Sequence, residues 1–348
     1  MTELEPSVSI IILNYNSGSL LLQCIESIFK SDYGDYEIIV IDNASKDNSH
    51  KKCKEKFPHI VLIENKENLG YCEGNNLGIK RSRGDFLVIL NPDTIVDKNW
   101  LKELISAYHH FGEGLYQPKL LSLDGNSEIN SAGNMIQIFG FGYSRGKGEM
   151  DDGKYDQPQQ IGYPSGACLF TSKKLIEELG YFEPFLFAYH DDLDLGWRAA
   201  KIGINSYYIP SALVYHKESY NFKWSSEKFY LLERNRHYCL LAHYSKRTYY
   251  KILPYLILVE IAILFFYLSK GLLKHKIKGY IDLIKKRKYI AAQHFQLEKK
   301  RKIDDVEIIN MFKDEVFVPK EVSSGFINKN FNKFLLFMSK LARYSIQH

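Results

Sequence analysis

Short apolar runs alternate with helical patterns over the first 110 residues of the chain. The runs cover residues 8–13, 37–41, 60–63 and 86–90, and Gly, Asn, Asp or Pro bounds most of them. Continuous apolar runs with such breakers are typical of strands buried on both faces of a sheet. Apolar positions with a helical period follow the first strand, from Leu20 to Phe29, and we expect further helices at 75–81 and 98–109. The alternation predicts βαβ units and a doubly wound α/β sheet.

Three of these strands end in polar residues. The pairs are Asn14 and Asn16, Asp42 and Asn43, and Asn91 and Asp93. Because open α/β sheets bind ligands at the carboxyl ends of their strands, three such endings predict a polar pocket at one edge of the sheet. No G-x-G-x-x-G motif follows the first strand, and the chain has no G-x-x-x-x-G-K-[ST] motif. A dinucleotide fingerprint or a P-loop is therefore disfavoured, and a metal could bind a pyrophosphate instead.

Asp93 is the candidate metal ligand of this pocket. Pro92 ends the preceding strand because it cannot donate a hydrogen bond to the ladder. Asn91 and Asp93 offer hard oxygen ligands, which suit Mg²⁺ or Mn²⁺. The alternative is that Asp93 caps a helix beginning near Thr94.

The second half of the chain carries a cluster of acids. Residues 122–160 have little periodicity and predict a long loop or flap, followed by a strand over 163–171. Asp191, Asp192 and Asp194 lie at the start of a helix that we expect to end at Gly203. Capping needs one acid, so three crowded acids favour a functional site over simple capping. A last strand over 206–209 places His216 just beyond the sheet, where it is either a ligand or a structural histidine.

Composition adds few constraints. A chain of 348 residues with 45% hydrophobic and 25% charged residues fits one large α/β domain with an appendage. The net charge of +5 predicts no global nucleic-acid footprint. Five cysteines without a CxxC pair argue against a zinc site or a disulfide framework and indicate a reducing compartment. The N-terminal residues MTELEPS do not resemble a signal peptide.

The appendage combines an apolar segment with a basic one. Residues 252–268 are apolar except for Glu260, and their number is close to that of a membrane-spanning helix. Residues 274–302 carry eleven Lys or Arg against Asp282 and Glu298, which predicts binding to an anionic membrane surface. The alternative is a soluble helical pair with a solvated basic face. We favour a surface or re-entrant helix over a span, because Glu260 is costly in hydrocarbon and a span would move a basic tail across the bilayer.

Taken in order, the motifs resemble the family 2 inverting glycosyltransferases with the GT-A fold, in particular the rhamnosyltransferase-like branch. The resemblance covers roughly residues 7–240. The matching segments are LNYN, VIDNASKDNS, NLGYCEGNNLGI, LNPDT, PSGACLF, GYFEPFLFAYHDDLDLGWRAAKIG and PSALVYHKES. The resemblance implies a GT-A catalytic domain at 1–240, with a nucleotide-sugar half at about 1–121 and an acceptor half at about 122–240. Residues 241–348 would then form a helical, membrane-associated region.

The resemblance also implies roles for individual residues. Asp93 and His216 would hold a divalent cation, Mg²⁺ or Mn²⁺, that neutralises the leaving diphosphate. Asp192, or its neighbour Asp191, would be the general base. Asp194 and Arg198 would brace the site by pairing one helical turn apart. The full set of implied donor-site residues is Asn14, Asn16, Asp42, Asn43, Asn68, Gly70, Asn75, Asn91, Gly166, Asp194 and Arg198.

Two departures from the family pattern bear on these roles. Asn91-Pro92-Asp93 stands where D-x-D is usual, so one charge is lost and the identity of the metal stays open. Asp191-Asp192 stands where Glu-Asp is usual, which leaves open which carboxylate is the base.

The expected function is transfer of a sugar from a nucleotide-diphosphate sugar, such as dTDP-rhamnose or a UDP-sugar, to a glycan or lipid-linked acceptor. The expected place is the cytoplasmic face of the cell membrane. One alternative is a polyprenyl-phosphate sugar synthase on the same fold. Another is a non-catalytic lipid- or RNA-binding protein on this scaffold. The catalytic acids and the lack of an RNP-type motif argue against the last, and we expect no nucleic-acid partner.

Overall fold

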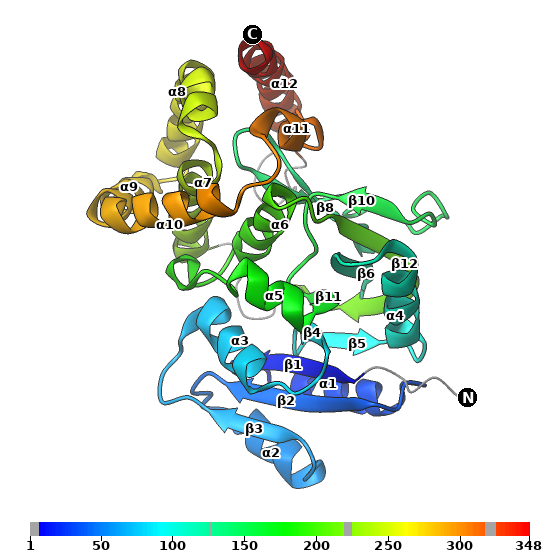
Figure 1. Ribbon diagram of the computed structural model, residues 1–348. Helices are drawn as coiled ribbons and strands as arrows, with labels where there is room; N and C mark the ends of the chain where they lie inside the picture. Colours follow the sequence, from blue (N-terminus) through cyan, green and yellow to red (C-terminus); the bar gives the residue numbers. More distant parts are fainter. Residues whose placement is uncertain (1–6, 125–126, 219–224, 317–324) are drawn as a thin grey trace. The chain divides into compact units, whose positions relative to one another are not determined.

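The computed structural model describes residues 7–124, 127–218, 225–316 and 325–348, which form two compact units (Figure 1). Unit 1 comprises the described residues up to 134 together with 144–199 and 204–218, and unit 2 comprises 135–143, 200–203 and the described residues from 225 onward. Unit 2 therefore includes α7 (Ser226–His243), which the expected division at residue 240 assigns almost entirely to the catalytic domain. The reason is packing, because α7 lies against α9 (Leu273–Lys285) and α10 (Arg287–Lys300).

Unit 1 is a mixed α/β fold. Its strands are β1 (Val8–Asn14), β2 (Tyr36–Asp42), β3 (Val61–Glu64), β4 (Phe86–Leu90), β5 (Thr94–Val96), β6 (Leu115–Ser122), β7 (Ile129–Ser131), β10 (Gln159–Ile161), β11 (Cys168–Ser172) and β12 (Ser206–His216). Its helices are α1 (Ser19–Phe29), α2 (Ser49–Lys56), α3 (Gly70–Arg81), α4 (Trp100–Phe111), α5 (Lys173–Leu179), the 3₁₀ turn η1 (Pro184–Leu186) and α6 (Asp191–Lys201), whose last residues belong to unit 2.

One sheet runs through unit 1 in the order β10-β12-β6-β11-β4-β1-β2-β3. The four strands β1 to β4 are parallel, as the alternation of strands and helices predicts. The sheet is nevertheless mixed, because β11 runs antiparallel to both β4 and β6. Figure 1 shows β1, β2 and β3 side by side at one end of this sheet.

Side chains on opposite faces of β1 have different neighbours. Ile10 and Ile12 join a buried core with residues of α1, α2 and α4. On the other face, Ile11 contacts the position of Gly78 on α3, where a Cβ atom would overlap its side chain. A glycine there lets α3 approach the sheet closely, so the sheet is covered on both faces, as a strand of continuous apolar residues requires.

The alternative role of Asp93 as a helix cap is wrong, and so are three expectations for local structure. Thr94–Val96 forms β5, paired with β12, so Asp93 precedes a strand and does not cap a helix. The segment 122–160 is not a bare loop, because β7 and β10 pair with the main sheet. The strand expected over 163–171 begins only at Cys168. The strand expected over 206–209 continues to residue 216, so His216 is its last residue.

Unit 2 is mainly helical. Besides α7, α9 and α10 it contains the short strands β8 (Asn134–Ile136) and β9 (Gly142–Ser144) and the helices α8 (Lys246–Ser269), α11 (Asp305–Asn310) and α12 (Gly325–Gln347). Within the described residues, α8 is the one helix long and apolar enough to cross a membrane. Pro254 lies near its start, and one side of α8 packs against α12.

Candidate active site

The predicted polar edge of the sheet is present in unit 1. Asn14 at the end of β1 is paired in register with Asp42 at the end of β2, and its Nδ2 donates a hydrogen bond of 2.7 Å to the Asp42 carboxylate. On the other side of β1, Ile12 is in register with Leu90, so Asn14 is level with the Asn91-Pro92-Asp93 segment. Three predicted strand endings therefore lie along one edge.

Asp42 is held by groups from several segments. Its Oδ2 accepts a hydrogen bond of 2.9 Å from the Ser45 amide, and its Oδ1 lies 3.1 Å from Nδ1 of His50. Asn14 also donates to the Ser49 hydroxyl at 2.9 Å. Asp42 is 2% exposed, so these contacts join the ends of β1 and β2 to the loop that precedes α2. His50 was not predicted, and nothing in its sequence position beyond its closeness to Asp42 marks it.

The asparagines of the donor half hydrogen-bond to one another. Nδ2 of Asn43 donates to Oδ1 of Asn68 at 3.1 Å and to the Gly70 carbonyl at 3.0 Å, and the Gly70 amide donates to the same Asn68 oxygen. Asn16, whose φ is 52°, accepts a hydrogen bond from the Lys46 amide at 2.8 Å. These amides shape the loops around the pocket, and the predicted donor contacts of Asn16, Asn43, Asn68 and Gly70 remain predictions.

Two further predicted asparagines differ in their surroundings. Asn75 is fully buried in α3 and donates to the Tyr71 carbonyl at 2.9 Å, while its Oδ1 has no hydrogen-bond partner among the described residues. Asn91 bonds through its backbone to the Ala167 carbonyl and to the Thr94 hydroxyl. Leaving a buried acceptor without a hydrogen bond lowers the stability of the fold. Oδ1 of Asn75 is such an acceptor among the described residues.

Asp93 and His216 face one another at the ends of β4 and β12. Oδ1 of Asp93 is buried, has no hydrogen-bond partner among the described residues, and lies 3.5 Å from Nε2 of His216. Nδ1 of His216 is 3.0 Å from Oδ1 of Asn130, whose Nδ2 donates to Glu218 at 3.0 Å. Because the Asn130 oxygen can only accept, Nδ1 of His216 is the donor of that hydrogen bond, and the ring is oriented with Nε2 on the side of Asp93.

This arrangement fits a divalent cation. A carboxylate oxygen and an imidazole nitrogen, both ligand types of divalent cations, lie 3.5 Å apart, and Asn130 orients the imidazole as an outer-shell partner does in metal sites. The predicted metal ligands are therefore brought together. Asn130, which orients one of them, was missed because a lone asparagine in an irregular segment carries no signal.

The acids at the start of α6 have different environments. Asp191 is 4% exposed, whereas Asp192 is only half-buried. Burial raises the pKa of Asp191 well above its usual range, and the neighbouring Asp192 charge raises it further. Burial also raises the pKa of Asp192 to about 6, against the lowering effect of hydrogen bonds from the Gly166 amide at 3.2 Å and the Leu193 amide at 2.8 Å.

These two pKa shifts separate the roles of the pair. A general base must be ionised at the working pH and must reach the substrate. At neutral pH Asp192, with a pKa of about 6, meets both conditions, whereas Asp191 is almost fully enclosed and burial raises its pKa well above the usual range. These differences are consistent with Asp192 as the base, and that role stays a prediction.

Gly166 and Ala167 connect the segment of the predicted metal ligand Asp93 to the predicted base Asp192. The Gly166 amide donates to Asp192, and the Ala167 carbonyl accepts from the Asn91 amide, two residues before Asp93. The Gly166 carbonyl in turn accepts the Tyr71 hydroxyl at 2.7 Å. One short loop before β11 thus contacts Asp192, the segment that leads to Asp93, and α3.

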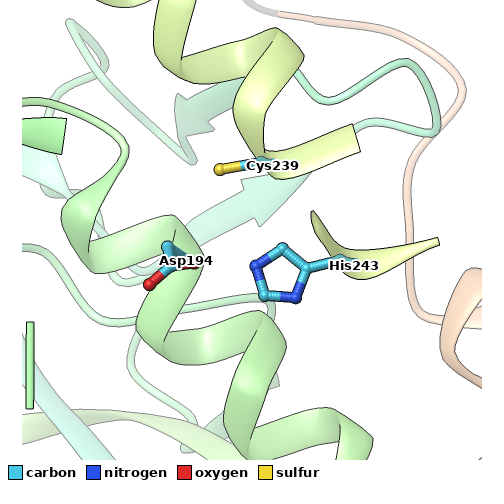
Figure 2. Close-up of side chains that lie close together, drawn as sticks. All are labelled: Asp194, Cys239 and His243. Atoms are coloured by element: carbon cyan, nitrogen blue, oxygen red, sulfur yellow. The ribbon is translucent and has the colours of Figure 1, made fainter. Parts of the chain in front are cut away.

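Asp194 and Arg198 pair as predicted, with Oδ2 of Asp194 2.7 Å from Nη2 of Arg198; Figure 2 shows the Asp194 side chain on α6. Nη1 of Arg198 donates to the carbonyls of Leu179 and Tyr181 at 2.6 Å each. The ion pair is buried, and it anchors α6 to the segment that precedes it. Both residues therefore support the loop before Asp191, and neither is shown to contact a ligand.

That loop has an unusual backbone. Tyr181, Phe187, Tyr189 and His190 all have φ values between 61° and 66°, in the left-handed region that side chains disfavour. Several such residues together store strain, which clusters at functional sites when the surroundings enforce it. The Phe187 carbonyl accepts the amide of Tyr71 at 2.6 Å, so α3 is one of those surroundings.

Comparison with known proteins identifies the family of one domain. Residues 9–180 match the model of "Glycosyl transferase family 2". The chain is 26% identical over 205 residues to the low-salt glycan biosynthesis hexosyltransferase Agl10 of Haloferax volcanii, covering 57% of this chain and 63% of that protein. It is 24% identical over 243 residues to the N-acetylglucosaminyl-diphospho-decaprenol L-rhamnosyltransferase of Mycobacterium tuberculosis, covering 64% of this chain and 78% of that protein. The chain thus spans less than two thirds of the length of Agl10.

Solved structures agree on the fold. GalNAc-T7, crystallised with UDP, GalNAc and Mn²⁺, superposes with a TM-score of 0.58 and 16% identity, over 73% of this chain and 51% of that one. The mannosyltransferase PcManGT of Pyrobaculum calidifontis, in complex with GDP-Man and Mn²⁺, gives a TM-score of 0.51 and 14% identity, over 98% of this chain and 88% of that one. The protein carries a glycosyltransferase family 2 domain with the GT-A fold.

Proposed function

We propose that the protein is an inverting, metal-dependent glycosyltransferase that uses a nucleotide-diphosphate sugar. The observation that carries the proposal is the loop at Gly166 and Ala167, which joins a half-buried carboxylate of raised pKa, Asp192, to the segment of the predicted metal ligand Asp93. A general base and a cation-binding carboxylate on two sides of one loop are what displacement of a diphosphate from a sugar requires.

The chain's own residues would act in a single displacement. Asp192 takes the proton from the acceptor hydroxyl while that oxygen attacks the anomeric carbon. The bond between the anomeric carbon and the diphosphate oxygen breaks, and its electron pair leaves with the nucleoside diphosphate. Attack opposite the leaving group inverts the configuration. Asp93 and His216 would hold the cation, Mg²⁺ or Mn²⁺, which when bound neutralises charge on the leaving diphosphate.

The residues of the donor half would shape the nucleotide pocket. Asp42 and Asn14 fix the strand ends, and Asn16, Asn43, Asn68 and Gly70 form the loops beside them. The side chain of Asn91, which is half-buried, would complete the polar lining, and Asn75 would support it from within α3. Such a lining suits a ribose or base, because hydroxyl and amide donors can satisfy its free acceptors.

The acceptor that we propose is a lipid-linked or other glycan acceptor at the cytoplasmic face of the cell membrane. Support comes from the names of the relatives, one a hexosyltransferase of glycan biosynthesis and the other a rhamnosyltransferase acting on a diphospho-decaprenol. dTDP-rhamnose and UDP-sugars are the donors to test first.

The test is transfer from a panel of nucleotide sugars to a polyprenyl-diphosphate N-acetylglucosamine acceptor in the presence of Mn²⁺. We expect one donor to give a glycosylated lipid whose new linkage has the opposite anomeric configuration to the donor, as determined by NMR. Asp192→Asn, which keeps the size of the side chain, is the control and should bind donor but not transfer. A retained configuration, or full transfer by Asp192→Asn, would refute the mechanism. In a parallel reaction that supplies polyprenyl phosphate as the acceptor, a product in which the sugar is attached directly to that phosphate would instead identify a polyprenyl-phosphate sugar synthase.

A further inference from the structure

Helix α8 has two apolar sides, and only one of them is packed. Ile252, Leu256, Val259, Ile263 and Tyr267 are buried inside unit 2. The opposite side carries a stripe of exposed apolar residues, which are Ile257, Leu258, Ile261, Leu264, Phe265 and Leu268. The spacing of three and four residues places these side chains on one face of the helix. A contiguous exposed apolar stripe of this size marks an interaction site.

Helix α9 continues this pattern with added charge. Ile277, Ile281 and Ile284 are exposed at helical spacing, and Lys274 and Lys278 are exposed one helical turn apart beside them. The buried side of α9 faces α7, which Figure 1 shows beside it. A row of lysines next to a row of isoleucines matches an interface where apolar side chains enter the bilayer and ammonium groups stay at the headgroups.

The surface around these two stripes is strongly positive. Lys270, Lys274, Lys278 and the run 285–288 give seven exposed cations. The opposing acid within that stretch is Asp282, whose carboxylate already accepts the Tyr230 hydroxyl at 2.7 Å. Seven cations around an apolar surface favour an anionic bilayer over a neutral protein partner.

The direction of the Glu260 side chain, in the middle of α8, shows which side of the helix stays within the protein and which side is free to enter lipid. Its carboxylate points to the packed side, where Oε2 lies 2.8 Å from Nζ of Lys276, 2.7 Å from the Tyr280 hydroxyl and 3.2 Å from Nε2 of His237. Arg236 contacts the other oxygen. Burial alone would raise the pKa of Glu260, but Arg236, His237 and Lys276 lower it below its usual range.

Glu233 completes this buried cluster. It contacts Lys276 and lies 2.8 Å from Arg236, so two carboxylates are balanced by two cations inside unit 2. For α8 to span a bilayer, Glu260 would have to leave these partners and enter hydrocarbon as an unpaired charge, which is unfavourable. The cluster therefore holds α8 against α7 and α9 with its free stripe outward.

We propose that the exposed stripes of α8 and α9 form a docking face that lies flat on an anionic lipid bilayer. This deepens the membrane association proposed above and depends on none of the residues of the catalytic site. The apolar side chains enter the outer part of the hydrocarbon, the basic side chains contact the headgroups, and Glu260 stays within the protein.

The decisive experiment measures how deeply labelled positions on α8 and α9 lie in the bilayer. Within the described residues all five native cysteines are buried, so a thiol-reactive fluorophore can be placed at Ile257→Cys, Leu268→Cys or Ile281→Cys in the full chain. Eleven residues separate Ile257 from Leu268, which is about 16 Å along a helix axis. With vesicles of phosphatidylcholine and phosphatidylglycerol carrying depth-specific quenchers, a flat helix gives nearly equal depths at all three positions. A spanning helix gives depths at Ile257 and Leu268 that differ by about 16 Å, and this result overturns the proposal.

A second experiment tests whether the basic residues of this face contribute to vesicle binding. Replacing Lys285, Lys286, Arg287 and Lys288 with Gln should weaken binding to these vesicles by up to about fivefold per residue at low salt, with a smaller effect at high salt. The matched control makes the same charge change at Lys30, Lys51, Lys52 and Lys102, which are exposed in unit 1, and should bind as the unmodified protein does. Equal weakening by both sets would show a nonspecific effect and refute the docking face.

Two further outcomes would also overturn the proposal. No fluorescence shift on anionic vesicles, together with a dimer in light scattering that Phe265→Glu disrupts, would assign the face to a second copy of the chain. A shift at Lys102→Cys equal to that at Ile257→Cys would show that the protein does not use this face. Because no step measures sugar transfer, a negative result here leaves the proposed transferase activity standing, and loss of transfer leaves the docking face standing.

Discussion

The ionisation of Asp192 predicts how kcat/KM for the nucleotide sugar depends on pH. Its pKa of about 6 in the free protein predicts that about 9% of the side chain is ionised at pH 5 and about 91% at pH 7. If the ionised form is the base, kcat/KM for the nucleotide sugar should rise about tenfold from pH 5 to pH 7 and then level off. An unburied aspartate, with a pKa near 4, would change by less than about 10% over the same range.

The assay is donor hydrolysis in Mn²⁺ at donor concentrations below KM, because kcat/KM reports the free enzyme. Asp192→Asn should lower kcat by about 10²–10⁴-fold and remove the rise between pH 5 and pH 7. Donor affinity, measured by calorimetry, should change little, which separates a lost base from a lost binding site.

Two results would refute this reasoning. A flat profile from pH 5 to pH 7 in the unmodified enzyme would show that no group with a pKa near 6 controls the reaction. If Asp191→Asn lowers turnover more than Asp192→Asn does, the base is Asp191 and not Asp192.

Three other predictions concern the metal site, the acid pair and the buried charges. Asp93→Ala should abolish Mn²⁺-dependent nucleotide binding while the far-ultraviolet circular dichroism stays unchanged, and His216→Ala should weaken it; wild-type affinity in Asp93→Ala would exclude the ligand role. Because the pKa of Asp191 is raised in the folded protein, this side chain ionises at a lower pH in the unfolded chain than in the folded one. Its contribution to the free energy of unfolding therefore becomes more unfavourable as the pH rises above about 4, until the folded pKa is passed. Asp191→Asn should therefore raise Tm more at pH 8 than at pH 4, and an equal or smaller gain at pH 8 would contradict the shift. Lys276→Met, which leaves buried carboxylates short of a cation, should lower the free energy of unfolding by about 3–5 kcal/mol in urea titration, whereas Lys274→Met at an exposed position should change it by less than about 0.5 kcal/mol.

The strand endings could be predicted from the sequence because their signal is local. A buried strand needs continuous apolar residues, and a polar residue directly after it can only lie at the sheet edge. Asn14, Asp42 and Asp93 follow from that rule, and the registers of β1 with β2 and β4 agree with it. The acids of α6 were equally visible, because three carboxylates in one turn need a reason.

What could not be predicted depends on contacts between distant segments. The antiparallel direction of β11 follows from its pairing with β4, about 80 residues earlier in the chain, and no local pattern encodes it. The roles of Asn43 and Asn68 likewise depend on which amide group lies opposite, so residues that look like ligand contacts hydrogen-bond to each other. Thr94–Val96 was ambiguous for the same reason, because three β-branched or apolar residues become a strand only when β12 lies beside them.

The join between α3 and the loop before α6 limits how this enzyme can be recombined with its relatives. Gly70 has a φ of +80°, and a Cβ atom there would overlap the ring of Phe187, whose carbonyl accepts the amides of Tyr71 and Cys72. Residues on either side of a junction drawn near residue 121 are therefore matched to each other. A chimera that takes residues before this junction from another transferase would also need that enzyme's counterpart of Phe187, so that positions 70 and 187 still fit each other. We therefore expect exchanges that keep α3 together with the loop before α6 to fold better than exchanges that divide the domain near residue 121.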